Sequence, residues 1–297
     1  MVELNCENLF DTRHDSLKQD TEYLPEGLRH WTRKRYWRKL NNIAQEILST
    51  CDSGIPDLVA LCEVENDTVL HDLVHRSLLR NAGYDYVMTA SPDLRGIDVA
   101  LVFNPFSFRL LDSYGVRVTP VKNMRPTRDI LYASGLLTRG DTLHVFVVHA
   151  PSRYGGERYS RPFRKAVADR LCESVDSVFA TTSDAHIVIA GDFNDEVDSP
   201  ALKTICQHRL RHLTKEARGQ NGVKGTYRYQ GRWGSIDHIL GSRSLYNKVD
   251  TAFVHAPKFL LEPDKLYGGN RPRRTFLGMT YQPGYSDHLP LVVRFRL

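Results

Sequence analysis

Residues 187–195 read IVIAGDFND, a run of four apolar residues that breaks abruptly into glycine, aspartate, phenylalanine, asparagine and aspartate. The apolar run predicts a buried strand, and the glycine predicts a turn at its end. Because side chains alternate along a strand, Asp192 and Asn194 are expected on the same side. A carboxylate and an amide at one spot can orient a water molecule and hold an anionic oxygen. An Asx-rich turn after a core strand would give the same pattern, so the rest of the chain must decide.

The composition is that of a soluble globular protein. The chain has 297 residues, of which 41% are apolar and 25% charged, enough for one large or two ordinary domains. No apolar run approaches the roughly 18 residues that a membrane span needs, and no signal-peptide pattern is present. The first expected strand begins directly after Met1, which would fit a chain whose upstream export leader has been removed.

The cysteine spacing and the net charge indicate which cross-links, metals and partners the chain can be expected to have. The cysteines are odd in number and show no C-x-x-C spacing, so we expect buried free thiols and neither a disulfide framework nor a zinc site. They are Cys6, Cys51, Cys62, Cys172 and Cys206. The net charge is +5, and basic residues cluster at 33–39 and 271–274, which favours an anionic partner. Aromatic residues interleave with the first cluster, a pattern shared by nucleic-acid surfaces and by ordinary amphipathic helices.

Polar side chains also interrupt two other apolar strands. Residues 2–11 predict a strand that carries Asn5 and Glu7 on one face, where both could offer oxygen to a metal ion, or simply face water. Residues 57–66 predict a buried strand that reaches Glu63. An unpaired charge there would be costly, so Glu63 should meet a cation or a strong donor.

The remaining pattern alternates strands with amphipathic helices. Strands are expected at about 84–90, 97–104, 108–118, 129–138, 142–149, 226–229, 235–240, 249–255 and 291–297, and helices at about 40–48, from Asp67, at 160–180 and from Ser199. The strands 129–138 and 142–149 are expected to form a hairpin. That hairpin ends at His149, which is either a structural cap or a catalytic group.

Six short blocks combine these features in one order along the chain. They are LNCEN (4–8), LCEVE (61–65), HAPS (149–152), GDFND (191–195), IDHIL (236–240) and SDH (286–288). The set resembles the endonuclease/exonuclease/phosphatase superfamily, relatives of deoxyribonuclease I and exonuclease III. The resemblance runs from residue 2 to 297 and implies one domain over 1–297. It also implies a four-layer α/β sandwich, in which two mixed β-sheets pack face to face and are flanked by helices.

The resemblance implies a metal site at one rim of the sandwich. Glu63 would be the metal carboxylate, helped by Asn5 and by Glu7 or Asp287. Oxygen-only ligands suit Mg²⁺ or Mn²⁺ rather than zinc. 

The same resemblance assigns the catalytic groups. Asp192 and Asn194 would orient the attacking water and hold the phosphoryl oxygens, and His288, supported by Asp237, would be a catalytic histidine. His149 matches the histidine of deoxyribonuclease I and the phosphatases, where exonuclease III has tyrosine. With an ordinary pKa of about 6.5 it could protonate a leaving alkoxide. 

Arg95 and Arg128 are candidate phosphate contacts. They lie in the segments Arg95-Gly96-Ile97-Asp98 and Arg125-Pro126-Thr127-Arg128. Solvated loop arginines would give the same pattern.

The leading hypothesis is a divalent-metal-dependent phosphodiesterase or nuclease acting on nucleic acid or a related phosphodiester. A phosphatase or phospholipase acting on an inositol phosphate or sphingomyelin headgroup is the alternative. Residues 236–238 read Ile-Asp-His where inositol 5-phosphatases have Cys-Asp-Arg, which argues against that subfamily. A non-catalytic binding protein on the same fold should lack an acidic or histidine position, and all of them are present here.

Overall fold

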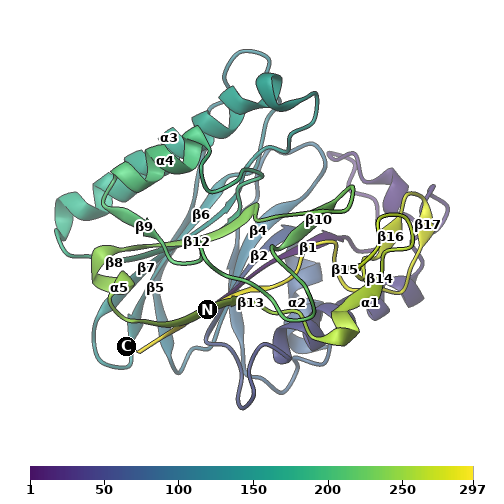
Figure 1. Ribbon diagram of the computed structural model, residues 1–297, viewed down its shortest axis with the longest axis horizontal. Coiled ribbons are helices and arrows are strands. Elements are labelled where there is room, and N and C mark those ends of the chain that lie inside the picture. Colours follow the sequence, from purple (N-terminus) through teal and green to yellow (C-terminus); the bar gives the residue numbers. More distant parts are fainter. Residues whose placement is uncertain (297) are drawn as a thin grey trace.

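Two six-stranded mixed β-sheets form the centre of the computed structural model, which describes residues 1–296 (Figure 1). The first sheet has the order β13 (Val249–Val254), β18 (Leu291–Phe295), β1 (Val2–Leu9), β2 (Leu58–Val64), β4 (Asp98–Phe103) and β3 (Asp85–Met88). The second has the order β5 (Phe108–Val116), β6 (Ile130–Leu137), β7 (Thr142–His149), β8 (His186–Asp192), β12 (Asp237–Ser242) and β9 (Leu210–His212).

Three apolar clusters define four layers, which confirms the predicted sandwich. One cluster lies between the sheets, where Ala60 and Cys62 of β2 share it with Val145 and Val147 of β7. A second lies between the first sheet and the helices α1 (Arg33–Leu48) and α2 (Asp67–His75). The third lies between the second sheet and the helices α3 (Glu157–Thr181) and α4 (Pro200–Gln207). Each sheet therefore buries both of its faces.

The helices follow their sequence signals closely. Leu40, Ile43 and Ile47 of α1 are fully buried, as their spacing predicts. Ser199 caps α4, and its side chain accepts a hydrogen bond from the backbone N–H of Leu202. 

The cap of α2 is Asn66 rather than the expected Asp67, because the Asn66 side chain accepts from the Val69 N–H.

The connections bring several strand ends to one rim of the sandwich. The pairs β1–β2 and β7–β8 are parallel and are joined through α1 and α3. The pair β6–β7 is the predicted antiparallel hairpin. Parallel neighbours end at the same edge of a sheet, so β1 and β2 present their carboxyl ends together, as do β7 and β8. 

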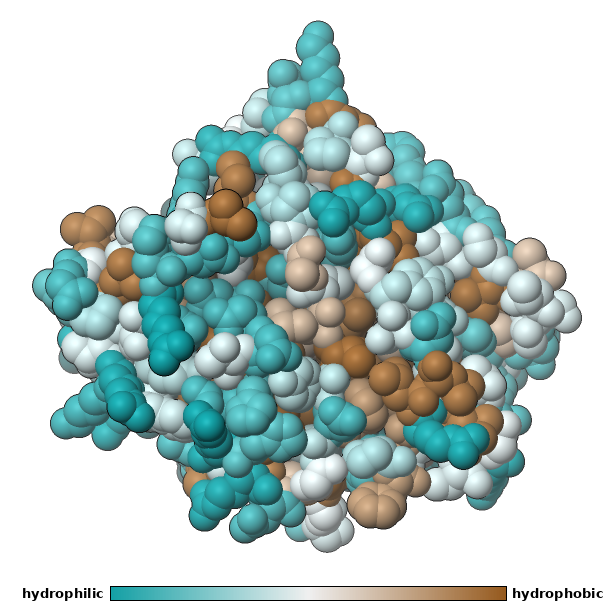
Figure 2. Space-filling view, turned by 180° about the vertical axis from the view of Figure 1, so that it is seen from behind, coloured by the Kyte–Doolittle hydropathy of each residue, from teal (hydrophilic) through white to brown (hydrophobic). Residues whose placement is uncertain are grey.

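Shorter elements surround this frame. They are β10 (Tyr227–Tyr229), β11 (Arg232–Gly234), α5 (Arg243–Tyr246), β14 (Leu261–Pro263), β15 (Asn270–Pro272), β16 (Phe276–Leu277), β17 (Thr280–Tyr281) and two 3₁₀ turns, Thr21–Tyr23 and Lys258–Leu260. The five cysteines are free thiols; Cys6, Cys62 and Cys172 are buried, as predicted, whereas Cys51 and Cys206 are half-buried. Within residues 1–296 no helix has the length and apolar character needed to cross a membrane. On the face shown in Figure 2, hydrophilic side chains cover most of the surface and hydrophobic ones form separate groups.

Candidate active site

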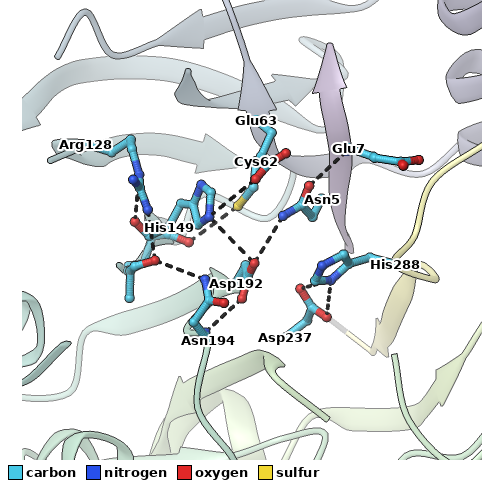
Figure 3. A network of polar contacts seen from close by, with 12 residues as sticks. Asn5, Glu7, Cys62, Glu63, Arg128, His149, Asp192, Asn194, Asp237 and His288 are labelled. Atoms are coloured by element: carbon cyan, nitrogen blue, oxygen red, sulfur yellow. Dashed lines mark hydrogen bonds and ion pairs between the residues drawn. The ribbon is translucent and has the colours of Figure 1, made fainter. Parts of the chain in front are cut away.

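The strand register places three predicted residues side by side. His149 on β7 pairs with Asp192 on β8, and Asp192 pairs with Asp237 on β12. From the facing sheet, Asn5 of β1 donates a hydrogen bond from Nδ2 to Oδ2 of Asp192, at 3.1 Å. Figure 3 shows Asp192 at the centre, with the side chains of Asn5 and His149 directed toward it and Asn194 beside it. The two sheets therefore meet in one polar network.

The backbone at this rim is strained. Residues Glu7, Asn8, Glu63 and Asn194 have φ between 50° and 64°, and they are four of the nine non-glycine residues with positive φ in residues 1–296. The register of β1–β2 also shifts between Asn5 and Leu9, and that of β2–β4 between Cys62 and Val64. Bulges and left-handed residues of this kind gather where a fold must re-aim side chains at a site.

Glu63 is aimed into the rim by its bulge. Its Oε2 accepts a hydrogen bond from the backbone N–H of Asn8 at 2.8 Å. Its Oε1 lies 3.5 Å from a guanidinium nitrogen of Arg95 and 3.9 Å from Nε2 of His149. Arg95 also donates to Oδ1 of Asn8 at 2.7 Å and is 48% exposed. Arg95 therefore lies beside Glu63 with much of its guanidinium open to solvent, where the sequence analysis placed a phosphate contact.

Glu7, in contrast, does not join the others. Its carboxylate accepts hydrogen bonds from the backbone N–H groups of Thr275 (2.6 Å) and Phe276 (3.3 Å) and from Nε of Arg274 (3.2 Å). Figure 3 shows its side chain extending away from Asp192. A regular strand would have kept Glu7 on the face of Asn5, but the left-handed backbone at Glu7 breaks that alternation. The structure thus gives Glu7 a structural position rather than the expected metal-ligand position.

Asp192 carries an unusual charge balance. Both oxygens are hydrogen-bonded, Oδ1 by the N–H of Asn194 at 2.8 Å and Oδ2 by Asn5. Burial, and then the neighbouring carboxylate of Asp237, raise the pKa of Asp192 to about 7. A carboxylate with a pKa near neutrality is suited to accept a proton from water at physiological pH.

His288 and Asp237 form a buried ion pair. Nδ1 of His288 lies 2.8 and 3.0 Å from the two carboxylate oxygens of Asp237. Burial opposes the charged imidazolium, but the carboxylates of Asp237, Asp287 and Asp192 together raise the pKa of His288 well above its usual value. The contact with Asp237 occupies Nδ1 and leaves Nε2 for another partner. His288 is therefore the protonated histidine of this rim.

His149 has the opposite charge state. Its Nε2 lies 3.6 Å from Oδ2 of Asp192, and its Nδ1 has no hydrogen-bond partner within residues 1–296. Burial lowers its pKa well below the usual value, and the nearby guanidinium groups of Arg128 and Arg95 lower it further. The expectation of an ordinary pKa near 6.5 was wrong, because burial disfavours the charged ring and the guanidinium groups of Arg128 and Arg95 disfavour it further. His149 is neutral at pH 7.

Arg128 also differs from the sequence interpretation. It is buried and donates hydrogen bonds from Nε to the carbonyl of His149 (3.2 Å), and from its terminal nitrogens to the carbonyl of Ala150 (2.9 Å) and to Asp93 (3.0 Å). These contacts fix the backbone that follows β7. Arg128 does not line the cleft, so its position is structural rather than that of a phosphate contact.

The turn after β8 is held by Asn194 and by three residues that the sequence analysis did not single out, Asp195, Arg164 and His238. Asn194 donates from Nδ2 to the carbonyl of Ala150 at 3.1 Å. The next residue, Asp195, is buried and forms an ion pair with the buried Arg164 of α3, 2.9 Å from Nε. His238 also bonds the Asp195 carbonyl through Nε2, at 2.8 Å. Arg164 lies in a helical pattern that looks like an ordinary exposed position, so only the fold reveals this contact.

Two groups of side chains could hold a cation. Asn5 and Glu63 could each offer a side-chain oxygen: Oδ1 of Asn5 accepts a hydrogen bond from the N–H of Glu7, and Oε1 of Glu63 faces the guanidinium of Arg95 at 3.5 Å. Oxygen donors of this kind suit a hard divalent cation. Asp192, Asp237 and His288 form a second candidate, with one ligand atom from each within 4.8 Å of the others. An acidic metal site thus fits the residues present.

All of these residues except the buried Asp237 line a cleft of about 1250 Å³. The polar part of its lining includes Asn5, Glu63, His149, Asp192, Asn194, Asp287 and His288. Asp287 lines the cleft and is paired with Arg274, whose guanidinium donates to it at 2.9 Å. The walls add arginines and aromatic residues that the sequence analysis did not identify, namely Arg153, Tyr154, Tyr227, Tyr229, Arg232, Trp233 and Tyr267.

Comparison with known proteins gives the same fold. The chain is similar to the catalytic domain of human Nocturnin with a bound sulfate anion (20% identity, TM-score 0.61, covering 100% of this chain and 94% of that one). It is also similar to the Bacteroides thetaiotaomicron mannosyl-6-phosphatase (17%, TM-score 0.64, 100% of both chains) and to a humanized D. rerio TDP2 (16%, TM-score 0.60, 100% and 98%). A sequence search of curated proteins gave no match. The model of the Endonuclease/Exonuclease/phosphatase family matches residues 1–296, so this chain belongs to that family.

Proposed function

We propose that this chain is a divalent-metal-dependent phosphodiesterase or nuclease, acting on nucleic acid or a related phosphodiester through one catalytic domain over residues 1–297. The observation that carries the proposal is the convergence of Asp192, Glu63 and the His288–Asp237 pair in one cleft. Family membership supports phosphoester hydrolysis. The sulfate bound to Nocturnin, a tetrahedral anion like phosphate, is consistent with such a substrate.

The proposed cation is Mg²⁺ or Mn²⁺, held by Glu63 and Asn5, with Asp287 at the edge of the cleft as a further candidate ligand. When bound, it would supply positive charge to a nonbridging phosphate oxygen. Asn5 also donates a hydrogen bond to Asp192. The proposed cation site is therefore in direct contact with the residue proposed to activate water. 

The chain's own side chains supply the proton transfers. Asp192 takes a proton from the attacking water, whose oxygen forms the new bond to phosphorus. The imidazolium of His288 gives its Nε2 proton to the leaving oxygen as the old bond breaks, and Asp237 stabilises the charged ring beforehand. His149 is neutral, so its role is to donate a hydrogen bond. Asn194 holds a phosphoryl oxygen.

The test compares Asp192→Asn with wild type on bis-p-nitrophenyl phosphate, single-stranded DNA and RNA in the presence of Mg²⁺. We expect kcat to fall at least ~10²-fold with KM nearly unchanged, because the residue acts on the transition state. Asp184→Asn, an exposed position just before β8, is the matched control and should behave as wild type. Turnover by wild type that survives chelation, or a loss confined to KM, would refute the proposal.

The same residues could act on a phosphomonoester. The observation that favours this second candidate is the similarity over the full length to a mannosyl-6-phosphatase. The ratio of kcat/KM for bis-p-nitrophenyl phosphate to that for p-nitrophenyl phosphate separates the two. A ratio well below one, with mannose 6-phosphate also hydrolysed, would favour the phosphatase.

A further inference from the structure

The hairpin β10–β11 extends directly from the catalytic residues. Tyr227 bridges to His288 in the backbone, and the two rings lie 4.8 Å apart between centroids. Side chains alternate along a strand, so Tyr229 follows Tyr227 on the same face, roughly 6.8 Å farther out. Arg232 lies opposite Tyr229 across the hairpin. The cleft-facing side of the hairpin is thus a row of two tyrosines that starts at His288 and ends beside an arginine.

The opposite side of the hairpin is anchored. Arg228 donates hydrogen bonds to the carbonyls of Gly268 (2.7 Å) and Asn270 and lies 3.6 Å from Asp264. These contacts fix the hairpin to the segment that joins β14 and β15. 

The tip of the hairpin packs against the same segment. Gly231 has φ of 78°, and a Cβ at this position would lie 2.7 Å from Cβ of Tyr267. The glycine therefore lets Tyr267 pack against the hairpin tip. A row of aromatic rings on a braced hairpin keeps its shape without a ligand, which lowers the entropy lost on binding.

The aromatic rings of this wall are open to solvent. Tyr229 is 62% exposed, Tyr267 is 52% exposed and Tyr154, which also lines the cleft, is 84% exposed. Arg153 and Arg232 lie among them in the lining. Exposed rings interleaved with arginines are the arrangement on which single-stranded nucleic acid binds, since bases stack on rings while phosphates meet the positive charge. 

We propose that the β10–β11 hairpin is a stacking platform for the bases of a single-stranded nucleic acid that flank the phosphate to be cleaved, with Tyr229 as the main ring. This inference rests on the proposed phosphodiesterase function and names its substrate class. The cleft of about 1250 Å³ exceeds the roughly 300–1000 Å³ of ordinary small-molecule sites, so it has room for more than one nucleotide. The row of rings leads away from His288, which matches a strand that continues beyond the reacting phosphate.

The test uses two fluorescent single-stranded oligonucleotides of equal length and charge, one with bases and one with abasic sites on either side of the central phosphate. Binding is measured by anisotropy on the Asp192→Asn background, so that the substrate is not consumed. We expect the oligonucleotide with bases to bind about 5- to 100-fold more tightly, the range given by one or more stacked bases. Tyr229→Ala should abolish most of this preference, and Tyr229→Phe should retain it.

The control is Tyr246→Ala. Tyr246 is a similarly exposed tyrosine on α5 that does not line the cleft, and its loss should leave the preference intact. Equal binding of both oligonucleotides by the parent protein would overturn the platform. A Tyr229→Ala variant that weakens the binding of both oligonucleotides equally would also overturn it. So would a variant that weakens only the binding of mannose 6-phosphate, which would indicate stacking on a sugar. Failure of the proposed function is a separate result: wild-type protein would cleave no phosphodiester with Mg²⁺ or Mn²⁺, whatever the anisotropy shows.

Discussion

Asp237 is the anion that keeps His288 charged, and the variant Asp237→Asn tests whether this charge is needed. Asparagine has nearly the same shape as aspartate, so the change removes the negative charge, keeps one oxygen acceptor and replaces the other oxygen by an amide donor. The carboxylate is fully buried, and both of its oxygens lie within 3.0 Å of Nδ1 of His288. No solvent can replace it at this position.

The size of the effect follows from this burial. Leaving one member of a buried ion pair unpaired costs about 3–5 kcal/mol. The imidazolium of His288 can avoid that cost by losing its proton, so we expect its pKa to fall substantially and the protein to stay folded. The charge that remains on Asp192 and Asp287 does not replace a direct contact. Without the proton, His288 no longer serves the leaving oxygen, and kcat should fall by about 10²- to 10⁴-fold, as for other general acids.

Two measurements check this prediction. NMR titration of the His288 ring reports its pKa, and kcat is measured on an alkyl phosphodiester and on bis-p-nitrophenyl phosphate. The alkyl ester should suffer more, because a nitrophenolate hardly needs a proton. The pair His208–Asp176, at 2.8 Å but partly exposed, provides the control Asp176→Asn, which should leave kcat unchanged. A variant with kcat within threefold of wild type, or with an unchanged His288 pKa, would refute the reasoning.

Three further predictions concern other parts of the network. Glu63→Gln should raise the Mg²⁺ or Mn²⁺ concentration needed for half-maximal activity at least ~10-fold, measured by cation titration, because it removes a negative ligand. Burial raises the pKa of Glu46 to about 8 from an ordinary 4.5, so the wild-type protein loses stability as the pH rises from about 4.5 to 8. Glu46→Gln carries no such charge and should be more stable than wild type by up to about 3 kcal/mol at pH 7 and nearly equal to it at pH 4.5. Urea unfolding at the two pH values measures the difference. Arg164→Met should cost about 3 kcal/mol, because the buried Asp195 then keeps only the more distant Arg153, 3.6 Å away, as a charged partner, whereas Arg161→Met, at an exposed position on the same helix, should cost less than about 1 kcal/mol.

Much of the site could be predicted from the sequence because it lies at strand ends. An apolar run that stops at a polar residue marks both the strand and its exit, and Asp192 and His149 emerge at neighbouring exits of parallel strands. Asp237 reaches the same rim as the first residue of β12, because β12 runs antiparallel to β8 and Asp237 pairs with Asp192. The sandwich itself followed from the order of six blocks, a resemblance rather than a calculation of packing.

Other features depend on contacts between distant segments. The charge state of His149 comes from burial and from Arg128 and Arg95, which lie 21 and 54 positions away in the chain. The sequence predicts a strand at 226–229, but the role of its tyrosine row appears only when Tyr227 is found against His288. Local patterns cannot carry such information, because the partner is chosen by the fold.

The bulge at Glu63 shows most clearly why the strand pattern alone could mislead. Along β2, Ala60 and Cys62 belong to the cluster between the sheets, whereas Leu61 packs beneath the helices. Strict alternation would place Glu63 with Leu61 in that apolar layer and Val64 between the sheets. Instead Val64 packs with Leu61, because the left-handed backbone at Glu63 inserts one extra residue. A left-handed non-glycine residue costs about 1–3 kcal/mol, far less than burying an unpaired carboxylate in an apolar layer. The strain therefore lets β2 continue its apolar packing past Glu63 while the carboxylate leaves the core and reaches the cleft.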